Sequence, residues 1–452
     1  MHSLLHALFL VGLLAVLGVA SPARFEKRSF KVERVKNANF GGHNGPRALM
    51  KAYQKYSMPI PPQLLNAIAR QNEEKAQLNN KKASVNPKAG ANNGTAARNG
   101  TAGVGLVTAT PEPQDVEYLS PVNIGGQTLN LDFDSGSSDL WVFSTQLPAA
   151  STTGHQLYDP TKSKTFAMLP GASFKISYGD GSGAAGNVGT DTVDIGGATV
   201  TRQAIEMATA VTRQFVEDTA NNGLLGLAFS QLNTVAPQRQ KTFFDNVMPS
   251  LAEPVFTADL RKNAVGAYEF GRIDNSKFTG QMTWIPVNTT LGFWQFTSQT
   301  FAVAGGKAQP SVANAQAIAD TGTTLILANA KMVTGYYSQV KGAVNDAQVG
   351  GFTVPCDATL PDLMIDVGGV YMARVKGSDI NFAKVQGNSE YTERCTTEYP
   401  RLTSSSMFRR RTGNHVEHPD LRRHLLQVPV CSLQWREQHT RHGRAHLDKR
   451  CV

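Results

Sequence analysis

The chain has 452 residues, of which 41% are hydrophobic and 17% charged, and its formal net charge is +9. The charge is uneven, because residues 21–103 carry +11, residues 104–395 carry −8 and residues 396–452 carry +6. The positive charge avoids the central body and is not interleaved with aromatic residues, which disfavours a nucleic-acid-binding protein. The length allows a targeting segment, a prosegment and a two-lobed body with a sizeable core.

Residues 1–20 have the pattern of a secretory signal peptide. Residues 4–20 are almost wholly apolar and end in Gly18, Val19 and Ala20, small residues that are typical of a cleavage site. The apolar stretch is short for a membrane span, and no second span follows it in the sequence. We therefore expect a secreted, extracellular protein without a membrane partner.

Residues 21–103 form a basic prosegment and linker. Within them, residues 48–53 and 63–69 have apolar side chains at helical spacing. Residues 83–110 are rich in Asn, Gly, Ala and Thr, a composition typical of a flexible, cleavable linker.

A secretory route makes two covalent modifications possible. N-glycosylation sequons begin at Asn93, Asn99 and Asn288. The body contains two cysteines, Cys356 and Cys395, which could form one disulfide in an oxidising compartment.

After the linker the sequence has an all-β pattern. Short runs rich in Val, Ile, Phe and Thr alternate with the glycine pairs 125–126, 196–197 and 305–306, as in strands joined by turns. Long helices are scarce, and residues 241–251 are the candidate for one.

One local pattern occurs twice in this body. Residues 131–138 read Leu-Asp-Phe-Asp-Ser-Gly-Ser-Ser, and residues 318–324 read Ile-Ala-Asp-Thr-Gly-Thr-Thr. Each copy is an apolar strand that leads into an aspartate, a hydroxyl residue and a glycine. The two aspartates, Asp134 and Asp320, are 186 positions apart, a spacing that suits one copy in each of two similar lobes.

The two copies together indicate a catalytic carboxylate pair. A glycine turn lets an aspartate at a strand end project inward, and two carboxyl groups in contact cannot both ionise, so they share a proton. The ionised member can take a proton from water while the protonated member polarises a carbonyl. A single Asp-Ser-Gly or Asp-Thr-Gly is commonly only a turn, but two copies with matching apolar lead-ins favour catalysis.

On these residues the chain resembles the pepsin-like aspartic proteases, and most closely the secreted fungal aspergillopepsin type. The resemblance covers residues 104–395, and much of residues 28–82 resembles the prosegment of the family. It implies an all-β, bilobal pepsin-like fold with two β-barrel-like lobes, residues 104–283 and 284–395, and the active-site cleft between them. The dyad of these enzymes is a standard example of two carboxyls sharing a proton.

The resemblance also implies roles for individual residues. Asp134 and Asp320 would be the catalytic pair, supported by loop residues Ser135, Gly136, Ser137, Thr321, Gly322 and Thr323. The flap, a hairpin that closes over substrate, would span residues 176–182 and contribute Tyr178, Gly179 and Asp180, with Trp141 as the hydrogen-bond partner of Tyr178. Residues 223–227 resemble the segment that buttresses the first catalytic loop, and Cys356 and Cys395 match the disulfide positions of the C-terminal lobe.

The prosegment suggests a mechanism of inhibition. Lys55 and Tyr56 lie where prosegments of the family place a lysine across the two aspartates; the ordinary alternative for Lys55 is a solvated helix face. A prosegment of +11 should bind a body of −8 at neutral pH, and acid weakens that attraction by protonating carboxylates. We therefore expect a zymogen that activates itself in acid.

The resemblance stops after Cys395. Residues 396–452 contain 6 of the 10 histidines, but without a consistent metal-ligand spacing. Read one base later, the codons of residues 416–435 permit SSILTFGDIFFKSQYVLFNG, which is close to what the family supplies there and has glycine in place of Arg422. We therefore interpret the tail as a frameshift product. In the given frame the C-terminal lobe would lack its last strands and expose edges.

The sequence thus predicts an acid aspartic-type endopeptidase that hydrolyses polypeptides. We expect its own prosegment as an intramolecular inhibitor, sensitivity to pepstatin-like inhibitors, a monomer, and no cofactor, metal or nucleic acid. The main alternative is an inactive pepsin-like binding protein, which is supported by the incomplete C-terminal lobe alone. A serine hydrolase is disfavoured, because there is no Gly-x-Ser-x-Gly motif and His155 is the only histidine of the body.

Overall fold

The structure is a computed structural model that describes most of the body and shorter parts of its flanks. It describes residues 30–33, 45–55, 60–82, 110–111, 118–178, 182–260, 265–277, 283–323, 325–346, 351–384, 394–397, 401–402, 425–429, 438–439 and 445–446. Where it is described, the chain is mostly β-strand with few helices. This confirms the predicted all-β class.

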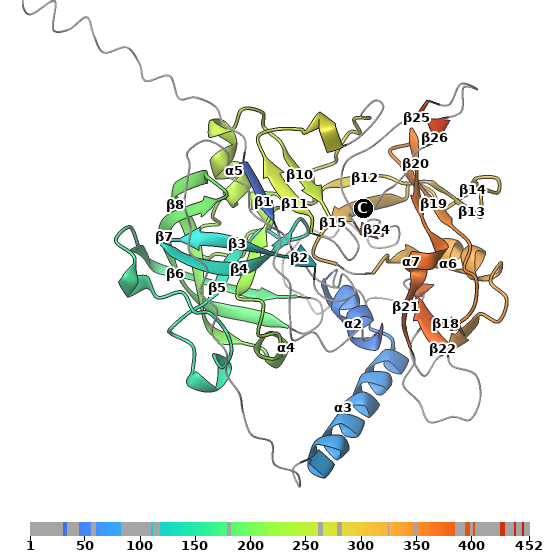
Figure 1. Cartoon of the computed structure of the whole chain (residues 1–452), viewed down its shortest axis with the longest axis horizontal. Helices are drawn as coiled ribbons and strands as arrows, with labels where there is room; N and C mark the ends of the chain where they lie inside the picture. Colours follow the sequence, from blue (N-terminus) through green and yellow to red (C-terminus); the bar gives the residue numbers. More distant parts are fainter. Residues whose placement is uncertain are drawn as a thin grey trace, which may run out of the picture.

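An eight-stranded sheet forms the first half of the body (Figure 1). Its strands are β2 (Thr110–Pro111), β3 (Tyr118–Ile124), β4 (Gln127–Asp134), β5 (Leu140–Phe143), β6 (Ala167–Ser177), β7 (Gly183–Ile195), β8 (Ala198–Val211) and β9 (Gly223–Gly226). They lie in the order β2-β3-β4-β9-β5-β8-β7-β6, and β3 also pairs with β7. That extra pairing closes β3, β4, β9, β5, β8 and β7 into a barrel.

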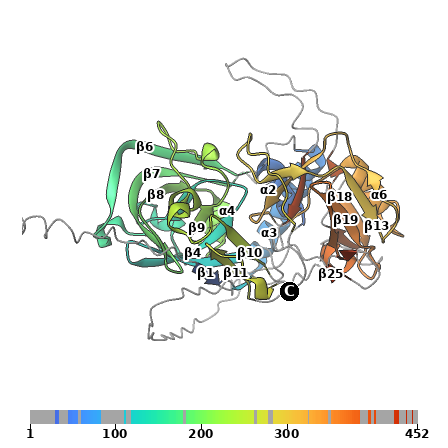
Figure 2. The same ribbon diagram turned by 90° about the horizontal axis from the view of Figure 1, so that it is seen from above.

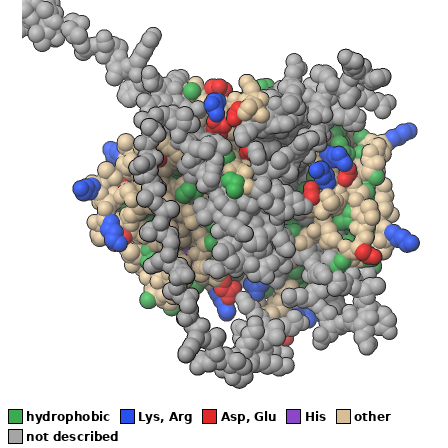
Figure 3. Space-filling view, viewed as in Figure 1, with side chains coloured by type: hydrophobic (Ala, Val, Ile, Leu, Met, Phe, Trp, Pro, Cys, Tyr) green, Lys and Arg blue, Asp and Glu red, His purple; other side chains and the backbone are tan. Residues whose placement is uncertain are grey.

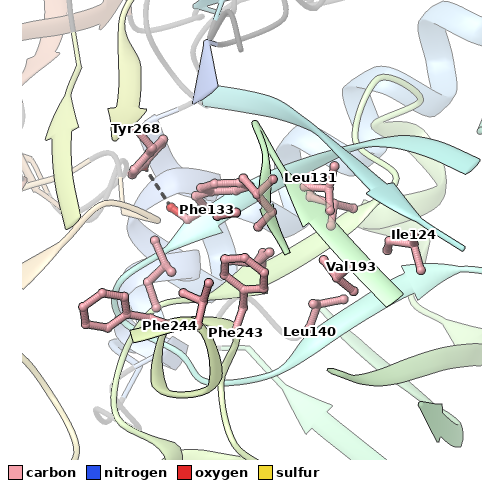
Figure 4. Packing of buried hydrophobic residues seen from close by; sticks show 14 of the residues in the cluster. Ile124, Leu131, Phe133, Leu140, Val193, Phe243, Phe244 and Tyr268 are labelled. Carbon is pink, nitrogen blue, oxygen red and sulfur yellow. Dashed lines mark hydrogen bonds between the residues drawn. The ribbon is translucent and has the colours of Figure 1, made fainter. Parts of the chain in front are cut away.

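The hairpin of β3 and β4 shows how the sequence builds this barrel. Gly125 and Gly126 form its turn with φ angles of +55° and +86°, which glycine adopts at little cost. Buried and more exposed residues alternate along the end of β3, so Ile124 faces the core. There it joins the buried side chains Leu131 and Phe133 of β4 (Figure 4).

A short helix and a small sheet complete this half. The helix predicted over residues 241–251 is α5 (Phe243–Val247), followed by a 3-10 turn, Met248–Ser250. Phe243 and Phe244 of α5 pack into the barrel core (Figure 4). The small sheet has the order β1-β11-β10, formed by β1 (Phe30–Glu33), β10 (Phe256–Asp259) and β11 (Ala267–Phe270).

The second half of the body has a hydrophobic core of its own, which contains Phe301, Val303 and Ile365 among others. Trp294 packs against both cores. The first half has two buried clusters, which contain Phe133 and Trp141, and neither shares a buried residue with the cluster of the second half. Separate cores are the mark of two lobes, and the two halves lie side by side in Figures 1 and 2. The elements of this half are β12 (Gln295–Thr297), β13 (Thr300–Val303), β14 (Gln309–Pro310), β15 (Gln316–Asp320), β16 (Ala328–Asn329), α6 (Ala330–Tyr337), β17 (Val344–Asp346), β18 (Gly351–Pro355), β19 (Leu363–Val367), β20 (Tyr371–Val375), α7 (Gly377–Ile380), β21 (Asn381–Lys384) and β22 (Arg394–Thr397).

The tail adds short strands to this half, which corrects one expectation. Strand β24 (Leu425–Pro429) runs parallel to β15 and puts Pro429 opposite Asp320, and β23 (Arg401–Leu402) runs parallel to β16. The expectation that the lobe lacks its closing strands is therefore wrong beside β15. Arg422 lies outside the described residues. The remaining tail strands, β25 (Gln438–His439) and β26 (Ala445–His446), pair with each other.

Two helices of the basic N-terminal region confirm the predicted helical stretches. They are α2 (Gly45–Lys55) and α3 (Pro62–Lys82). Leu49, Met50 and Tyr53 of α2 are buried in a small cluster with residues of the second half. Among the helices described, none is long and apolar enough to cross a membrane. Figure 3 shows one face of the molecule, and the Lys and Arg side chains visible on it are scattered rather than gathered in one patch.

Candidate active site

The two Asp-containing loops lie against each other and exchange hydrogen bonds. Asp134 ends β4 and Asp320 ends β15, and their exposed fractions are 1% and 0%. The backbone N–H of Ser135 donates to Thr321 Oγ1 at 2.9 Å, and the N–H of Thr321 donates to Ser135 Oγ at 2.9 Å. Each loop therefore holds the backbone of the other.

The same two hydroxyls also donate across the junction. Ser135 Oγ donates to the carbonyl of Ala319 at 2.9 Å, and Thr321 Oγ1 donates to the carbonyl of Phe133 at 2.6 Å. Each hydroxyl thus accepts one hydrogen bond and donates another, which satisfies its donor. The four bonds relate the two loops symmetrically and fix the strand ends that carry the aspartates.

Each carboxyl group is also held by its own loop. The N–H of Gly136 donates to Asp134 Oδ1 at 2.8 Å, and the N–H of Gly322 donates to Asp320 Oδ1 at 3.0 Å. Thr323 Oγ1 donates to Asp320 Oδ2 at 2.6 Å.

The matching residue in the first loop behaves differently. Ser137 Oγ is buried and has no hydrogen-bond partner among the described residues. The two loops are therefore similar in backbone, but the matching hydroxyls differ, because Thr323 donates to its carboxyl and Ser137 does not.

Gly322 brings the second loop into contact with Asp134. A Cβ atom on Gly322 would overlap Asp134 Oδ1 and lie 2.5 Å from Asp134 Cγ. No side chain larger than hydrogen fits there without displacing the carboxyl group. The glycine of one loop is thus required for the approach of the aspartate of the other.

The segment 223–227 supports the first loop from behind, as the sequence predicts. Strand β9 pairs parallel to β4 with Gly226 opposite Asp134. The N–H of Gly226 donates to the carbonyl of Asp139 at 2.8 Å, and the N–H of Leu227 donates to the carbonyl of Asp134 at 2.7 Å. A Cβ on Gly226 would lie 2.5 Å from Ser138 Cα, so glycine permits this close packing.

Tyr178 lies beside this loop at the end of the long β6–β7 hairpin. Trp141 Nε1 donates to Tyr178 Oη at 2.8 Å, as expected. Burial, followed by the charges of Asp139 and Asp134, raises the pKa of Tyr178 well above its ordinary value. Gly179 and Asp180 lie outside the described residues.

Phe215 is a neighbour of this pair that the sequence analysis missed. Phe215 lies in α4 (Arg213–Glu217), and its ring packs edge-on against Trp141 at 4.8 Å and against Tyr178 at 5.7 Å between centroids. A single phenylalanine in a five-residue helix carries no periodic signal. The contact depends on tertiary structure alone.

The structure describes the remaining predicted site residues only in part. Cys356 is disulfide-bonded, and Cys395 in β22 pairs with Val354 in the ladder; their mutual bond stays a prediction. Lys55 ends α2, and Tyr56 lies outside the described residues. Within the described part of the chain, no group of three or more His, Cys, Asp and Glu residues could hold a metal ion.

Comparison with known proteins agrees with this arrangement. The family model described as eukaryotic aspartyl protease matches residues 117–407. The chain is 51% identical over 288 residues to aspergillopepsin-1 of Aspergillus flavus, covering 64% of this chain and 70% of that protein. It is 51% identical over 285 residues to penicillopepsin-1 of Penicillium rubens, covering 63% and 70%. It is 45% identical over 366 residues to endothiapepsin of Cryphonectria parasitica, covering 80% of each. The chain therefore belongs to the eukaryotic aspartyl protease family and is an aspartic-type endopeptidase.

Proposed function

We propose that this protein is a secreted acid endopeptidase in which Asp134 and Asp320 together activate a water molecule. The observation that carries the proposal is the exchange of hydrogen bonds between Ser135 and Thr321, the residues that follow the two aspartates. These hydrogen bonds support a pair of buried carboxyl groups, one on each of two facing loops. Such a pair shares one proton and titrates as a unit.

Peptide hydrolysis follows from the chemistry of such a pair. The ionised carboxyl takes a proton from water, and the water oxygen forms a bond to the scissile carbonyl carbon. The protonated carboxyl gives its proton to the carbonyl oxygen, which yields a neutral tetrahedral intermediate. The carboxyl that took the proton from water then gives it to the amide nitrogen, while the other carboxylate takes a proton from one hydroxyl of the intermediate. The C–N bond breaks, which releases one peptide with a new amino group and one with a new carboxyl group.

Tyr178 serves as the flap residue in this proposal. The hydrogen bond from Trp141 and the ring contact with Phe215 fix its side chain beside the first loop. An extended polypeptide of several residues would lie across the aspartates beneath the flap that carries Tyr178. Flap closure excludes water that is not needed for the reaction.

The basic N-terminal region serves as an intramolecular inhibitor. Leu49, Met50 and Tyr53 of α2 are buried with Leu325, Leu327 and Phe382. Residues 325–327 follow directly after the second Asp loop, so this cluster lies close in sequence to Asp320. The contact supports a prosegment that docks there and carries Lys55 toward the aspartates, where a positive charge would block the water.

Secretion and the covalent features complete the proposal. Residues 1–20 would be removed as a signal peptide, residues 21–103 would be removed on activation in acid, and Cys356 would pair with Cys395. The alternative of an inactive pepsin-like binding protein loses its main support, because β24 occupies the position beside β15.

Hydrolysis of denatured haemoglobin at about pH 3, where ordinary Asp side chains begin to protonate, tests the proposed function. The full chain is assayed with and without pepstatin, next to Asp134→Asn and Asp320→Asn. Pepstatin-sensitive activity that both substitutions abolish would support the proposal. Full activity in either variant would refute the two-aspartate mechanism.

A further inference from the structure

A second pair of carboxyl groups is buried behind the first Asp loop. Asp139 is the last residue before β5, and Glu206 lies in β8, which runs parallel to β5 with Glu206 opposite Trp141. Both acids have an exposed fraction of 1%. A buried carboxylate is costly unless it is paired with a cation or accepts enough hydrogen bonds, so such groups often hold a proton instead.

Hydrogen bonds from the segment after β9 reach one oxygen of each acid. Asn233 Nδ2 lies 3.2 Å from Asp139 Oδ1 and 3.0 Å from Glu206 Oε1. The N–H and hydroxyl of Thr234 also donate to Asp139 Oδ1, at 2.9 Å and 2.8 Å. One amide group therefore bridges the two acids, and all of these donors leave Oδ2 and Oε2 unused.

The two unused oxygens are the decisive feature. Asp139 Oδ2 and Glu206 Oε2 are buried and have no hydrogen-bond donor among the described residues. The Asn233 amide nitrogen, which is within hydrogen-bond distance of both acids, brings the two carboxyl groups together, and a hydrogen bond between their side chains affects the pKa of each. A hydrogen bond between two carboxyl groups needs a proton on one of them, because two carboxylates are both acceptors only.

We propose that Asp139 and Glu206 share one proton, and that this proton positions the first catalytic loop. The inference deepens the function proposed above, because the loop matters only if Asp134 takes part in catalysis. The two acids are positioning residues that do not touch substrate. Loss of the proton would leave two like charges in contact in a buried site and push the end of the loop away from β8.

The backbone carries this effect to Asp134. The carbonyl of Asp139 accepts from the N–H of Gly226, and the carbonyl of Asp134 accepts from the N–H of Leu227. Between them, Ser138 Oγ donates to the carbonyl of Phe229 at 2.7 Å. A displacement of Asp139 would therefore strain the contacts that hold the catalytic strand end.

The surroundings keep the proton on the pair. Among the described residues, the titratable groups that act on it are Asp134, from the same loop, and Tyr178, from the flap hairpin. Asn233 and Thr234 face it from the segment after β9 and carry no charge. Burial raises the pKa of Asp139, and burial together with the charge of Asp139 raises the pKa of Glu206 well above its ordinary value.

The sign of the pH effect follows from these directions. A carboxyl whose folded pKa is raised binds more protons in the folded chain than in the unfolded chain. The contribution of the pair to the free energy of unfolding is then complete at pH values below the ordinary carboxyl pKa. It is lost as the pH rises through the raised pKa of the folded chain. The enzyme should lose its active loop as the pH rises toward neutrality.

Glu206→Gln separates this proposal from a purely structural role. The glutamine amide can donate to Asp139 without titrating, so it replaces the shared proton at every pH. The full chain and the variant are compared by thermal unfolding and by kcat and KM between about pH 3 and 8, a range that spans ordinary and raised carboxyl pKa values. The unfolding temperature of the full chain should fall as the pH rises. We expect the midpoint of that fall to lie about one pH unit or more higher in the variant.

Catalysis should follow the same shift. In the unmodified chain kcat should fall with rising pH before KM changes, and in Glu206→Gln that fall should move to higher pH. Glu217→Gln is the matched control, since Glu217 is a solvent-accessible acid on α4 that pairs with Arg213 at 2.8 Å; it should leave the pH profile unchanged.

Two further variants keep the test decisive. Asp139→Asn should shift the profile in the same direction, and it replaces Glu206→Gln if that variant does not fold. Infrared difference spectra should contain a protonated-carboxyl C=O band that Glu206→Gln lacks. Unshifted profiles in both amide variants would overturn the proposal. Asp134→Asn should be inactive yet keep the fall in unfolding temperature with rising pH. A failure of the proposed function would therefore be distinguished from a failure of this inference.

Discussion

The backbone N–H of Ser135 donates to the hydroxyl of Thr321, and the backbone N–H of Thr321 donates to the hydroxyl of Ser135, both at 2.9 Å. The two residues are 186 positions apart, and each follows one of the two aspartates. The junction between the lobes and the positioning of the carboxyl pair therefore depend on the same hydrogen bonds. A change at either hydroxyl should affect stability and catalysis together.

The first prediction concerns that coupling. Ser135→Ala and Thr321→Val should each destabilise the fold by about 1–3 kcal/mol, because each leaves buried backbone groups without partners. The double variant should lose less than the sum of the two, since they break one shared network. Urea unfolding measures all three. Thr201→Val, at an exposed position of β8, is the control and should stay within about 0.5 kcal/mol.

A second prediction concerns the contact between Gly322 and Asp134. Gly322→Ala should lower kcat at least about 100-fold, because the added Cβ displaces the Asp134 carboxyl and small misplacements of catalytic groups are costly. Gly351→Ala is the matched control, since no atom lies within 4 Å of its added Cβ. Equal activity in the two variants would mean that catalysis does not require the close contact between Gly322 and Asp134. Circular dichroism checks that both variants fold.

Much of the site could be predicted from the sequence because its signal is local and repeated. Asp134 and Asp320 are each followed by a hydroxyl residue and a glycine, and those residues make the bonds that hold the carboxyls. The strand end, turn and hydroxyl lie within a few residues of each other, so the pattern fixes the local geometry.

Other parts depend on contacts between distant segments and could not be predicted. The buried acids Asp139 and Glu206 come together because β5 and β8 are neighbours in the barrel. The local sequence does not distinguish either residue from an acid that is exposed to solvent. Phe215 is a lone aromatic residue in a short helix. Strand β24 lies in a tail that lacks the alternation of apolar and polar residues typical of a strand. Its pairing with β15 therefore had no signal in the sequence.

A third prediction concerns the hydrogen bond between Trp141 and Tyr178. Trp141→Phe removes the indole donor and leaves the Tyr178 hydroxyl without it, so the flap tyrosine becomes less well fixed. We expect kcat/KM to fall about tenfold, which corresponds to the loss of about 1.4 kcal/mol from one buried hydrogen bond. Trp284→Phe is the control, because Trp284 is 72% exposed. A similar fall in both variants would contradict the assignment.

A fourth prediction concerns the docking of α2. Leu49→Ala should weaken prosegment binding by about 2–5 kcal/mol, the usual cost of truncating a buried leucine, because Leu49 is buried with Leu325 and Phe382. The unprocessed chain should then show activity, and process itself, at a higher pH than the unmodified chain. Leu65→Ala on α3 is the matched control, since Leu65 is 50% exposed. Processing is followed by gel electrophoresis across a pH series; identical pH dependence in both variants would exclude this docking site.

The last prediction concerns the strand beside Asp320. In the first lobe Gly226 lies opposite Asp134 and its N–H donates to Asp139; in the second lobe Pro429 lies opposite Asp320, and proline has no N–H to donate. The frame read one base later supplies a glycine in place of Arg422 and an apolar strand after it. We therefore expect transcripts through codons 385–452 to carry the shifted frame. The one-base-corrected chain should unfold at a higher temperature than the given chain, because a proline opposite Asp320 lacks the N–H that Gly226 uses in the first lobe to hold the Asp139 carbonyl. A clean in-frame transcript, with equal unfolding temperatures for the two chains, would instead establish β24 as the natural neighbour of Asp320.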